Sequence, residues 1–475
     1  MSLLLSVLGR VKSVRALSSK LVFMVIEQEG HHIQIVCNLS KLDAETVTDS
    51  MKKTFRTVAR KGDWFGVVGY PHKTSRGEPS ILASELPQLQ SPSLHQIPAK
   101  VEDEETKARR PHVGLLADQA DVQTLRIRSR LETLLASWFE EHEFMRINTP
   151  ILTAGASGAT ARPFSTVATE LASTTLNLRI APELWLKRLV LGGMGKVYEI
   201  GPAFRNEGVD NTHNPEFTMC EFYWPFQNLD QLMATTENML HTLFEQLSSL
   251  NPAMTSHLPD SIVHRSEADR SPKPFFTKTF PRLPFVPTLE REMGLPLPDL
   301  DSPDATEQLQ KLFTDKNLSR PANATIPSLL DALCAEYIEP LCGAPTFITE
   351  HPAALSPLAK SFRCPTTGHL VSARAELFIG RAEYANMYEE ENSPFEQRKK
   401  FEAQLRYRKD GNSGDTMEVD ESYLEALEWG LPPTGGWGLG FDRLVMLFTG
   451  RKRIGDVLPF GTLRNVVGLQ RAWRK

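Results

Sequence analysis

The sequence predicts an α+β protein, with a small N-terminal β-barrel followed by a larger domain that has an antiparallel sheet flanked by helices. Residues 1–95 contain short alternating apolar runs separated by Gly-containing turns, which is typical of a small barrel. Residues 119–143 carry apolar side chains at helical spacing. Residues 197–224 contain two runs with strand-like alternation on either side of a polar loop, as in an antiparallel hairpin.

The expected barrel spans residues 1–96 and includes one helical stretch near residues 41–60. Residues 97–118 are polar, charged and punctuated by proline, so we expect an interdomain linker there. The larger domain then spans residues 119–475. Within it we expect a helix at 226–250 and short strands or loops at 251–290.

Two further segments of the larger domain contain no residue to which we assign a catalytic or binding role. Residues 291–345 predict a mostly helical insertion, whose expected role is packing or a cover over bound nucleic acid. Residues 395–421 predict a charged loop or helix.

Length and composition place the chain among globular proteins. Its 475 residues, 41% hydrophobic and 23% charged, leave room for two or three domains. No apolar run approaches the roughly 18 residues that span a membrane, so we expect no membrane association. The five cysteines show no CxxC pair or zinc spacing, which predicts reduced thiols. A net charge of −5 does not indicate a nucleic-acid partner, but a local basic face would be enough to bind one.

The first 26 residues contain no Asp or Glu and carry several basic side chains and serines. Such a composition is typical of an organellar targeting sequence. The same residues also predict the first strands of the barrel, so no separate leader is visible.

The chemistry concentrates in residues 197–224, VYEIGPAFRNEGVDNTHNPEFTMCEFYW. If the two runs pair, one surface gathers a guanidinium, two carboxylates, an aromatic ring and a phenol. These groups belong to Arg205, Glu207, Phe217, Glu221 and Tyr223. Such a set suits a ligand with a phosphate, a purine and a cationic amine. The alternative is a hairpin held by structural ion pairs.

The segment FRNEGVDNTHNPEFTMCEFY resembles motif 2 of the class II aminoacyl-tRNA synthetases, in the form used by lysyl-tRNA synthetases. The match is long and ungapped, so it is more specific than a lone glycine pattern. The resemblance covers about residues 5–465 and implies an N-terminal OB-fold and a class II catalytic domain. It also implies ATP, L-lysine and tRNA(Lys) as partners, Mg²⁺ as cofactor, and a homodimer.

The order of strands in the barrel resembles the anticodon-binding OB-fold of the lysyl, aspartyl and asparaginyl enzymes. The resemblance implies that Phe23 stacks on an anticodon base and that three polar side chains bind the uracils: Arg15, Gln34 and Glu78. Taken alone, Phe23 could equally be a core residue.

The segment up to FMRINTPILT resembles motif 1, the dimer-forming helix and strand, with Pro150 as its proline. The loop GASGATARPF resembles a glycine loop that approaches the amino acid through Gly158. The family usually has two consecutive glycines here, whereas this chain has Ser157 and Gly158. Pro182 predicts the start of a helix and Gly192–Gly193 its end. Glu183, in the first turn, matches the carboxylate for the substrate's α-ammonium; alone it could equally be a helix-dipole partner.

In the segment RAELFIGRAEYANMYEEENSP, Glu376 and Glu383 lie on either side of a Gly-Arg turn. Hard carboxylate oxygens hold Mg²⁺ on ATP, and the resemblance implies this role for both. Asn386, Tyr388 and Glu390 alternate on one strand face and resemble the lysine pocket. The resemblance implies that Asn386 contacts the carboxylate of the bound lysine and that Glu390 lies beside its ε-ammonium.

The segment GGWGLGFDR resembles motif 3, a Gly-rich strand that enters a helix, with Arg443 at the ATP γ-phosphate or the adenine. The resemblance places Arg205 on the α-phosphate and the lysine carboxylate. It places Tyr223 with Glu390 at the ε-ammonium and includes Glu221 among the lysine-binding residues. Three further residues of motif 2 would bind the nucleotide: Glu207, His213 and Phe217.

The resemblance implies lysyl-adenylate formation followed by transfer of lysine to tRNA. Aspartyl- and asparaginyl-tRNA synthetases are rivals, but their pocket is cationic where this chain has acids. A relative that modifies an elongation factor lacks the N-terminal barrel. An inactive RNA-binding or signalling scaffold is a further alternative. The C-terminal DVLPFGTLRNVVGLQRAWRK resembles the organellar branch, which favours the mitochondrial matrix over the cytoplasm.

Overall fold

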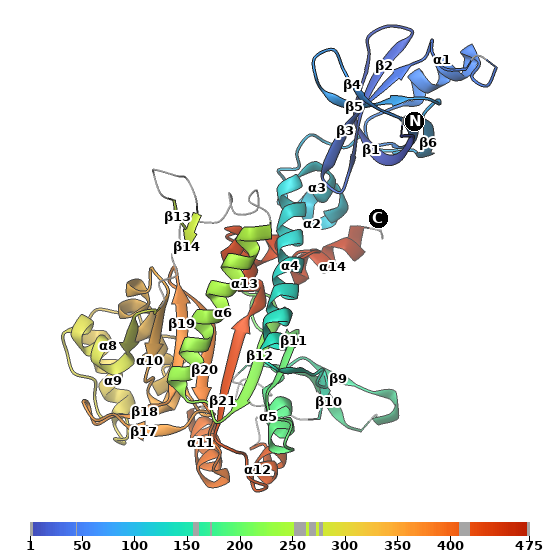
Figure 1. Cartoon of the computed structure of the whole chain (residues 1–475). Coiled ribbons are helices and arrows are strands. Elements are labelled where there is room, and N and C mark those ends of the chain that lie inside the picture. Colours follow the sequence, from blue (N-terminus) through green and yellow to red (C-terminus); the bar gives the residue numbers. More distant parts are fainter. Residues whose placement is uncertain are drawn as a thin grey trace. The chain divides into compact units, whose positions relative to one another are not determined.

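The computed structural model describes residues 3–43, 45–154, 161–171, 173–250, 263–265, 272–274, 279–407 and 419–472. The chain divides into two compact units, Met1–Val122 and Gln123–Lys475 (Figure 1). None of the described helices is long and apolar enough to span a bilayer.

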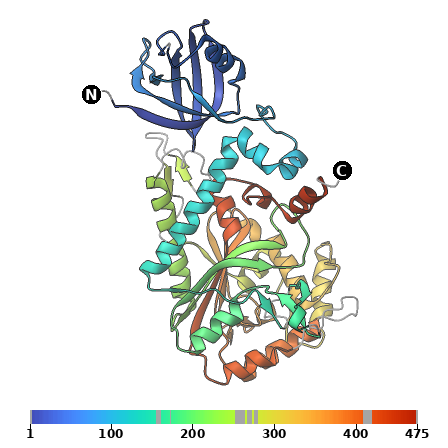
Figure 2. The same ribbon diagram turned by 90° about the vertical axis from the view of Figure 1, so that its right-hand side faces the viewer.

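The first unit contains a closed β-barrel, which includes helix α1 between its strands β3 and β4 (Figure 2). Strands pair in the order β1-β2-β3-β5-β4-β6, and pairing of β1 with β4 closes the barrel. Alternating side chains of β1–β5 fill the interior, among them Met24, Ile35 and Phe65. The elements are β1 (Leu5–Ala16), β2 (Leu21–Gln28), β3 (His31–Asn38), α1 (Asp49–Val58), β4 (Trp64–Lys73), β5 (Pro79–Ala83) and β6 (Gln88–Ser91). The structure therefore confirms the predicted barrel.

The basic N-terminal segment belongs to this barrel, because β1 and β2 already begin at Leu5 and Leu21. The segment expected as a linker contains two short helices, α2 (Glu104–Arg109) and α3 (Pro111–Ala117). Pro111 suits the first turn of α3, where its missing N–H costs no hydrogen bond. Helix α4 (Gln119–Glu141) follows directly.

The second unit contains an eight-stranded sheet in the order β15-β16-β19-β20-β21-β12-β11-β7. Its pairs are antiparallel except for the two at its edges, β15–β16 and β7–β11. The strands are β7 (Met145–Arg146), β11 (Val197–Phe204), β12 (Glu216–Pro225), β15 (Arg282–Pro284), β16 (Thr346–Thr349), β19 (Arg374–Ile379), β20 (Ala382–Glu389) and β21 (Thr434–Gly440).

Three helices cover one face of this sheet: α4, α6 (Leu229–Leu250) and α13 (Phe441–Thr449) (Figure 1). Their apolar faces pack with Tyr198, Phe222 and Trp437 into one buried core. Asp442 ties α13 to its neighbours, because its carboxylate accepts from the Thr218 N–H at 2.8 Å and pairs with Arg128. The opposite face of the sheet is thereby left for a ligand.

The expected helical insertion at 291–345 contains the end of α8 (Phe285–Met293) and the whole of α9 (Ala305–Asp315) and α10 (Ile326–Tyr337). These helices form a second core with part of the sheet. Most of residues 251–290 lies outside the described residues. The expectation of strands or loops there is correct for β13 (Val263–Arg265), β14 (Pro272–Pro274) and β15, but wrong for residues 285–290. Pro284 caps α8, whose apolar residues recur at helical spacing and pack into the core.

The remaining elements complete the unit. Helices α11 (Pro394–Tyr407) and α12 (Glu421–Leu427) lie in the charged segment near 395–421, and α14 (Leu463–Ala472) lies near the C-terminus. The short strands are β8 (Leu152–Thr153), β9 (Ser165–Val167), β10 (Thr175–Leu178), β17 (Ser361–Arg363) and β18 (Leu370–Ser372). All five cysteines are buried, and none of them is bridged to another.

Strand β21 gives the sheet two different faces. Trp437 and Leu439 point into the helical core, whereas the alternate positions on the other face, Gly436, Gly438 and Gly440, are glycines. In register, Gly438 lies between Glu221 of β12 and Asn386 of β20. The glycine face therefore forms a floor of backbone, flanked by functional side chains on both neighbouring strands.

Candidate active site

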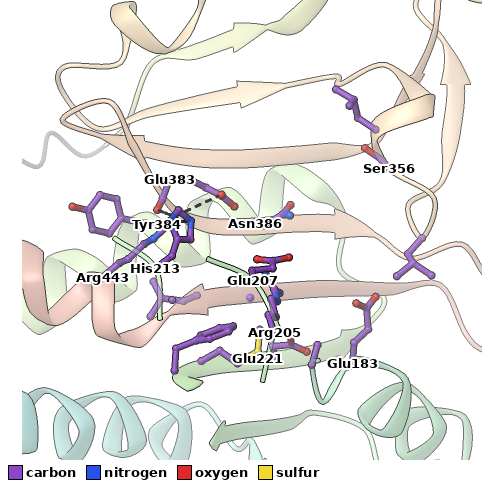
Figure 3. Close-up of a pocket in the computed structure, with 18 of the residues that line it drawn as sticks. Glu183, Arg205, Glu207, His213, Glu221, Ser356, Glu383, Tyr384, Asn386 and Arg443 are labelled. Atoms are coloured by element: carbon purple, nitrogen blue, oxygen red, sulfur yellow. Dashed lines mark hydrogen bonds and ion pairs between the residues drawn. The ribbon is translucent and has the colours of Figure 1, made fainter. Parts of the chain in front are cut away.

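A cavity of about 620 Å³ lies over the glycine face of β21. Many predicted site residues line it: Glu183, Arg205, Glu207, His213, Phe217, Glu221, Tyr223, Glu383, Asn386, Tyr388 and Arg443. In Figure 3, Arg443, His213 and Glu383 group at one end, and Glu183 lies at the other. Glu376 and Glu390 are not among the lining residues. Gly158 lies outside the described residues.

The predicted hairpin is confirmed, because β11 and β12 pair antiparallel with Ala203 opposite Phe217. Arg205 follows β11, and its guanidinium carbon lies 5.2 Å from the centroid of the Phe217 ring. The Arg205 Nε is buried and has no hydrogen-bond partner. An unused buried donor costs free energy unless a ligand accepts its hydrogen bond. The Arg205 Nε and the Phe217 ring could therefore serve an anionic group and a planar ring of a ligand.

A second arginine is held by the polar loop of the hairpin. Arg443 approaches the His213 Nε2 at 2.9 Å, and the His213 Nδ1 lies 2.9 Å from Asp210 Oδ2. Arg443 also donates to the Glu383 backbone oxygen at 2.8 Å, and its guanidinium lies 3.8 Å from the Glu383 carboxylate. The loop between β11 and β12, the first turn of α13 and the start of β20 thus converge on one cationic group.

The two carboxylates expected to bind metal lie in contrasting surroundings. Burial would raise the pKa of Glu376, but Arg374 and His351 outweigh it and lower that pKa to about 2. Burial, followed by repulsion from Glu376, raises the pKa of Glu383 to about 7. The negative charge of Glu383 is therefore poorly compensated, and a divalent cation beside it would favour the ionised form.

This donor set fits Mg²⁺, which prefers one or two carboxylates together with substrate phosphates. Within the parts of the chain that the structure describes, no group of three or more His, Cys, Asp or Glu side chains could hold a metal. The remaining ligands would have to come from a bound nucleotide or water.

The other end of the cavity is acidic and aromatic. Glu183 is the first residue of α5 (Glu183–Leu191), which begins after Pro182 and ends at Gly192, as predicted. Its Oε1 accepts hydrogen bonds from the Tyr388 hydroxyl at 2.8 Å and from the Lys187 Nζ at 2.6 Å. Helix α5 therefore presents a carboxylate with a fixed orientation at the cavity wall.

Glu221 lies beside this group on β12. Its Oε2 accepts from the Tyr223 hydroxyl at 3.1 Å. Burial, followed by repulsion from Glu183, raises the pKa of Glu221 to about 8. A ligand ammonium placed between these acids would offset that repulsion and favour the carboxylate.

Glu390 lies immediately after β20, completely buried behind this end of the cavity. One carboxylate oxygen, Oε2, pairs with the Lys187 ammonium. The other, Oε1, has no hydrogen-bond partner and faces Gly436. Burial raises the pKa of Glu390 well above its ordinary value, although Lys187 opposes the shift. The sequence pattern indicated this carboxylate but not that a residue of the protein already pairs with it.

Asn386 is also held by a residue that the sequence did not single out. Arg374 donates to Asn386 Oδ1 at 3.0 Å, to the Leu355 backbone oxygen at 2.8 Å, and pairs with Glu376. Its position in the sequence could have indicated Arg374, because it lies two residues before Glu376 and therefore on the same strand face. Lys187 had a similar signal, one helical turn after Glu183.

The four predicted base-binding residues lie on or beside the outer face of the barrel. Arg15 pairs directly with Phe23 across β1 and β2. Gln34 pairs with Ser80 on β5 and donates to its hydroxyl at 3.0 Å, and Glu78 is exposed just before β5. Phe23 is only partly buried, whereas its neighbours Val22 and Met24 fill the core. Phe23 therefore lies outside the buried core of the barrel, and its stacking on an anticodon base stays a prediction.

Comparison with known proteins agrees with this geometry. The family model described as tRNA synthetases class II (D, K and N) matches residues 103–464. The chain belongs to the class II tRNA synthetases.

This class II synthetase aligns with individual members of the family over most of its own length. It is 37% identical to the mitochondrial lysine–tRNA ligase of Schizosaccharomyces pombe, over 97% of this chain and 84% of that protein. It is 36% identical to a probable cytoplasmic lysine–tRNA ligase of Encephalitozoon cuniculi (96% and 86%). It is 35% identical to the lysine–tRNA ligase of Wolinella succinogenes (97% and 85%).

The close approach of Gly436 to Glu390 predicts an asymmetric response to added methyl groups on β21. A Cβ at Gly436 would overlap Glu390 Oε1 and lie 2.8 Å from Tyr223 Cε1, whereas at Gly438 the nearest atom is 3.6 Å away. We expect Gly436→Ala to destabilise the ligand-free protein by about 1–3 kcal/mol, and Gly438→Ala to change its stability little. Thermal unfolding of both variants without ligand tests this, and equal melting temperatures would contradict it.

The raised pKa of Glu221 predicts a pH-dependent stability. Its folded-state pKa of about 8 exceeds the ordinary 4.5, so the ligand-free protein takes up a proton on folding. Protonated Glu221 stabilises the folded state, and this contribution is complete below about pH 4.5. It declines as the pH rises from there and is lost at about pH 8, at a rate of at most about 1.4 kcal/mol per pH unit. Glu221→Gln should reduce this decline. Unfolding midpoints measured from pH 5 to pH 8 test it, and identical slopes in both proteins would refute the assignment.

Proposed function

We propose that this synthetase activates L-lysine with ATP to form lysyl-adenylate and then transfers the lysyl group to tRNA(Lys). The observation that carries the proposal is one cavity with Arg443 at one end, a buried acidic, tyrosine-lined pocket at the other, and Arg205 between them (Figure 3). Anionic phosphates suit the first end and the two ammonium groups of lysine suit the second.

At the nucleotide end, Arg205 binds the α-phosphate and the lysine carboxylate, using its free Nε. Phe217 offers its ring to the adenine, and Glu207 and His213 hold the nucleotide. Arg443, oriented by His213 and Glu383, neutralises the charge that develops on the pyrophosphate leaving group.

Mg²⁺ would be held by Glu383 and Glu376 together with ATP phosphate oxygens, and would supply charge neutralisation at those phosphates. Arg374 and His351 keep Glu376 ionised and fixed in place.

At the amino-acid end, Glu183 binds the α-ammonium while Tyr388 fixes its orientation. Asn386, held by Arg374, binds the lysine carboxylate. Glu221 and Tyr223 bind the ε-ammonium, with Glu390 beside them. The loop that contains Gly158 would approach the amino acid through its backbone. A neutral amino acid would leave buried carboxylates unpaired, which costs several kcal/mol.

Neither step needs a nucleophilic side chain. A lysine carboxylate oxygen attacks the α-phosphorus, and the bond to pyrophosphate breaks. A ribose hydroxyl of the tRNA then attacks the carbonyl carbon and releases AMP. The enzyme contributes orientation and charge neutralisation. The barrel contributes tRNA selection, with Phe23 stacking on an anticodon base and Arg15, Gln34 and Glu78 binding base edges.

ATP–pyrophosphate exchange, measured with each amino acid in turn, tests the activation step. We expect exchange with lysine alone, and Glu390→Gln should raise the lysine KM by about 10-fold or more. Lys311, an exposed residue of α9, offers a control position, because Lys311→Gln should leave exchange unchanged. Exchange with aspartate or asparagine would show that the pocket has been misassigned. Absence of exchange with every amino acid would favour the scaffold alternative.

We also propose that the protein is a homodimer. The segment that follows α4 carries several apolar side chains that are 41–59% exposed: Met145, Ile151, Leu152, Val167 and Leu171. Burial of such groups against a second copy would remove them from water. Leu152→Asp should therefore weaken self-association by about 10-fold or more. Analytical ultracentrifugation tests this, and a native protein that sediments as a monomer would overturn it.

We place the protein in the mitochondrial matrix. The likeness to the mitochondrial enzyme of Schizosaccharomyces pombe and the C-terminal resemblance to the organellar branch support this placement. A cytoplasmic relative of similar identity is the counterexample. Subcellular fractionation of the native protein distinguishes the two compartments.

A further inference from the structure

The amino-acid end of the cavity contains a buried cation that belongs to the protein itself. The Lys187 side chain is 1% exposed, and its ammonium lies between the carboxylates of Glu183 and Glu390. Its Nζ is 2.6 Å from Glu183 Oε1 and also pairs with Glu390 Oε2. No other residue with a positive charge is paired with either carboxylate among the described residues.

Three tyrosine rings surround this ammonium. Lys187 Nζ lies 5.7 Å from the ring centroids of Tyr223 and Tyr388 and 5.8 Å from that of Tyr423. Aromatic faces attract cations, and more strongly where water is excluded. Two of these tyrosines, Tyr223 and Tyr388, also line the ligand cavity. Lys187 therefore lies directly behind the wall that faces the amino acid.

The ammonium contacts one oxygen of each carboxylate. The Glu183 Oε1 is occupied by Lys187 and Tyr388, while Glu183 itself lines the cavity. Lys187 occupies Glu390 Oε2, but Oε1 has no hydrogen-bond partner. An unpaired carboxylate this deeply buried would take up a proton and become neutral. The pair with Lys187 is the structural feature that opposes this.

We propose that Lys187 is a positioning residue of the amino-acid pocket, whose buried ammonium holds Glu183 and Glu390 in place and keeps both as carboxylates for the ammonium groups of the substrate. The proposal rests on lysine being the substrate. The charges near this group are Glu183 on α5, Glu221 on β12 and Glu390 after β20, with Arg205 farther along the cavity. A fourth acid of the same sheet, Glu199, is already neutralised by Arg179 at 2.6 Å.

The pKa of Lys187 is consistent with a permanent cation. Burial alone would lower that pKa, but the Glu183 and Glu390 carboxylates outweigh burial and raise it. Lys187 therefore stays charged throughout the pH range in which the enzyme would be assayed.

The test is Lys187→Met, which keeps the length of the side chain and removes its charge. Because Glu390 then takes up a proton, we expect the KM for lysine at pH 7 to rise by about 10- to 100-fold, with little change in the KM for ATP. Raising the pH should lower the lysine KM of this variant, since a higher pH favours the Glu390 carboxylate. Loss of packing alone would give no such decrease.

Two further variants complete the experiment. Lys187→Met combined with Glu390→Gln removes both charges, so it avoids an orphan carboxylate and remains testable if the single variant does not fold. We expect a raised lysine KM that does not recover at high pH. Lys400→Met is the matched control, because Lys400 pairs at 2.6 Å with the adjacent Glu391 and does not line the cavity. Its lysine KM should stay at the wild-type value.

Several outcomes would overturn the proposal. An unchanged lysine KM in both Lys187 variants would show that the ammonium does not serve binding. A lower KM would show that Lys187 competes with the substrate instead. Equal effects of Lys187→Met and Lys400→Met would reduce its role to packing. The wild-type enzyme separates the two hypotheses: failure to activate lysine refutes the proposed function, whereas activity with unchanged variants refutes only the role of Lys187.

Discussion

The site depends on how β21 is inserted between β12 and β20. Because side chains alternate along a strand, one register places Glu221, Gly438 and Asn386 in a row, and the next row on the same face contains Gly436. A shift of one residue would exchange the glycine floor for Trp437 and close the cavity. The helical core on the far side, where that ring is buried, therefore fixes the register on which ligand binding depends.

Local patterns predicted much of this arrangement. Alternation in motif 2 gave the hairpin, its polar loop and the face shared by Arg205 and Phe217, because a strand pair determines which side chains meet. Pro182 and Gly192 predicted where α5 begins and ends, and therefore that Glu183 lies in its first turn. The gathering of residues from β12, β20 and α13 into one cavity followed from the family resemblance, since periodicity alone does not order strands in a sheet.

Features that depend on long-range packing could not be predicted from the sequence. A lysine four residues after a glutamate is ordinarily an exposed helical ion pair, and only the burial of α5 makes Lys187 part of the pocket. The sealed position of Glu390 and the bond from Arg374 to Asn386 have the same origin. Burying so many charges lowers stability unless each has a partner, so the pocket illustrates how binding specificity and stability are balanced.

The glycine floor has a consequence for inhibitor resistance. An inhibitor that rests on β21 contacts main-chain atoms there, and a side-chain substitution leaves main-chain groups unchanged. Enlarging Gly436 would displace Glu390, so a mutation that excludes the drug at that point would also damage the pocket that the enzyme needs. Resistance would then have to arise at lining residues away from β21, such as the exposed Asn323.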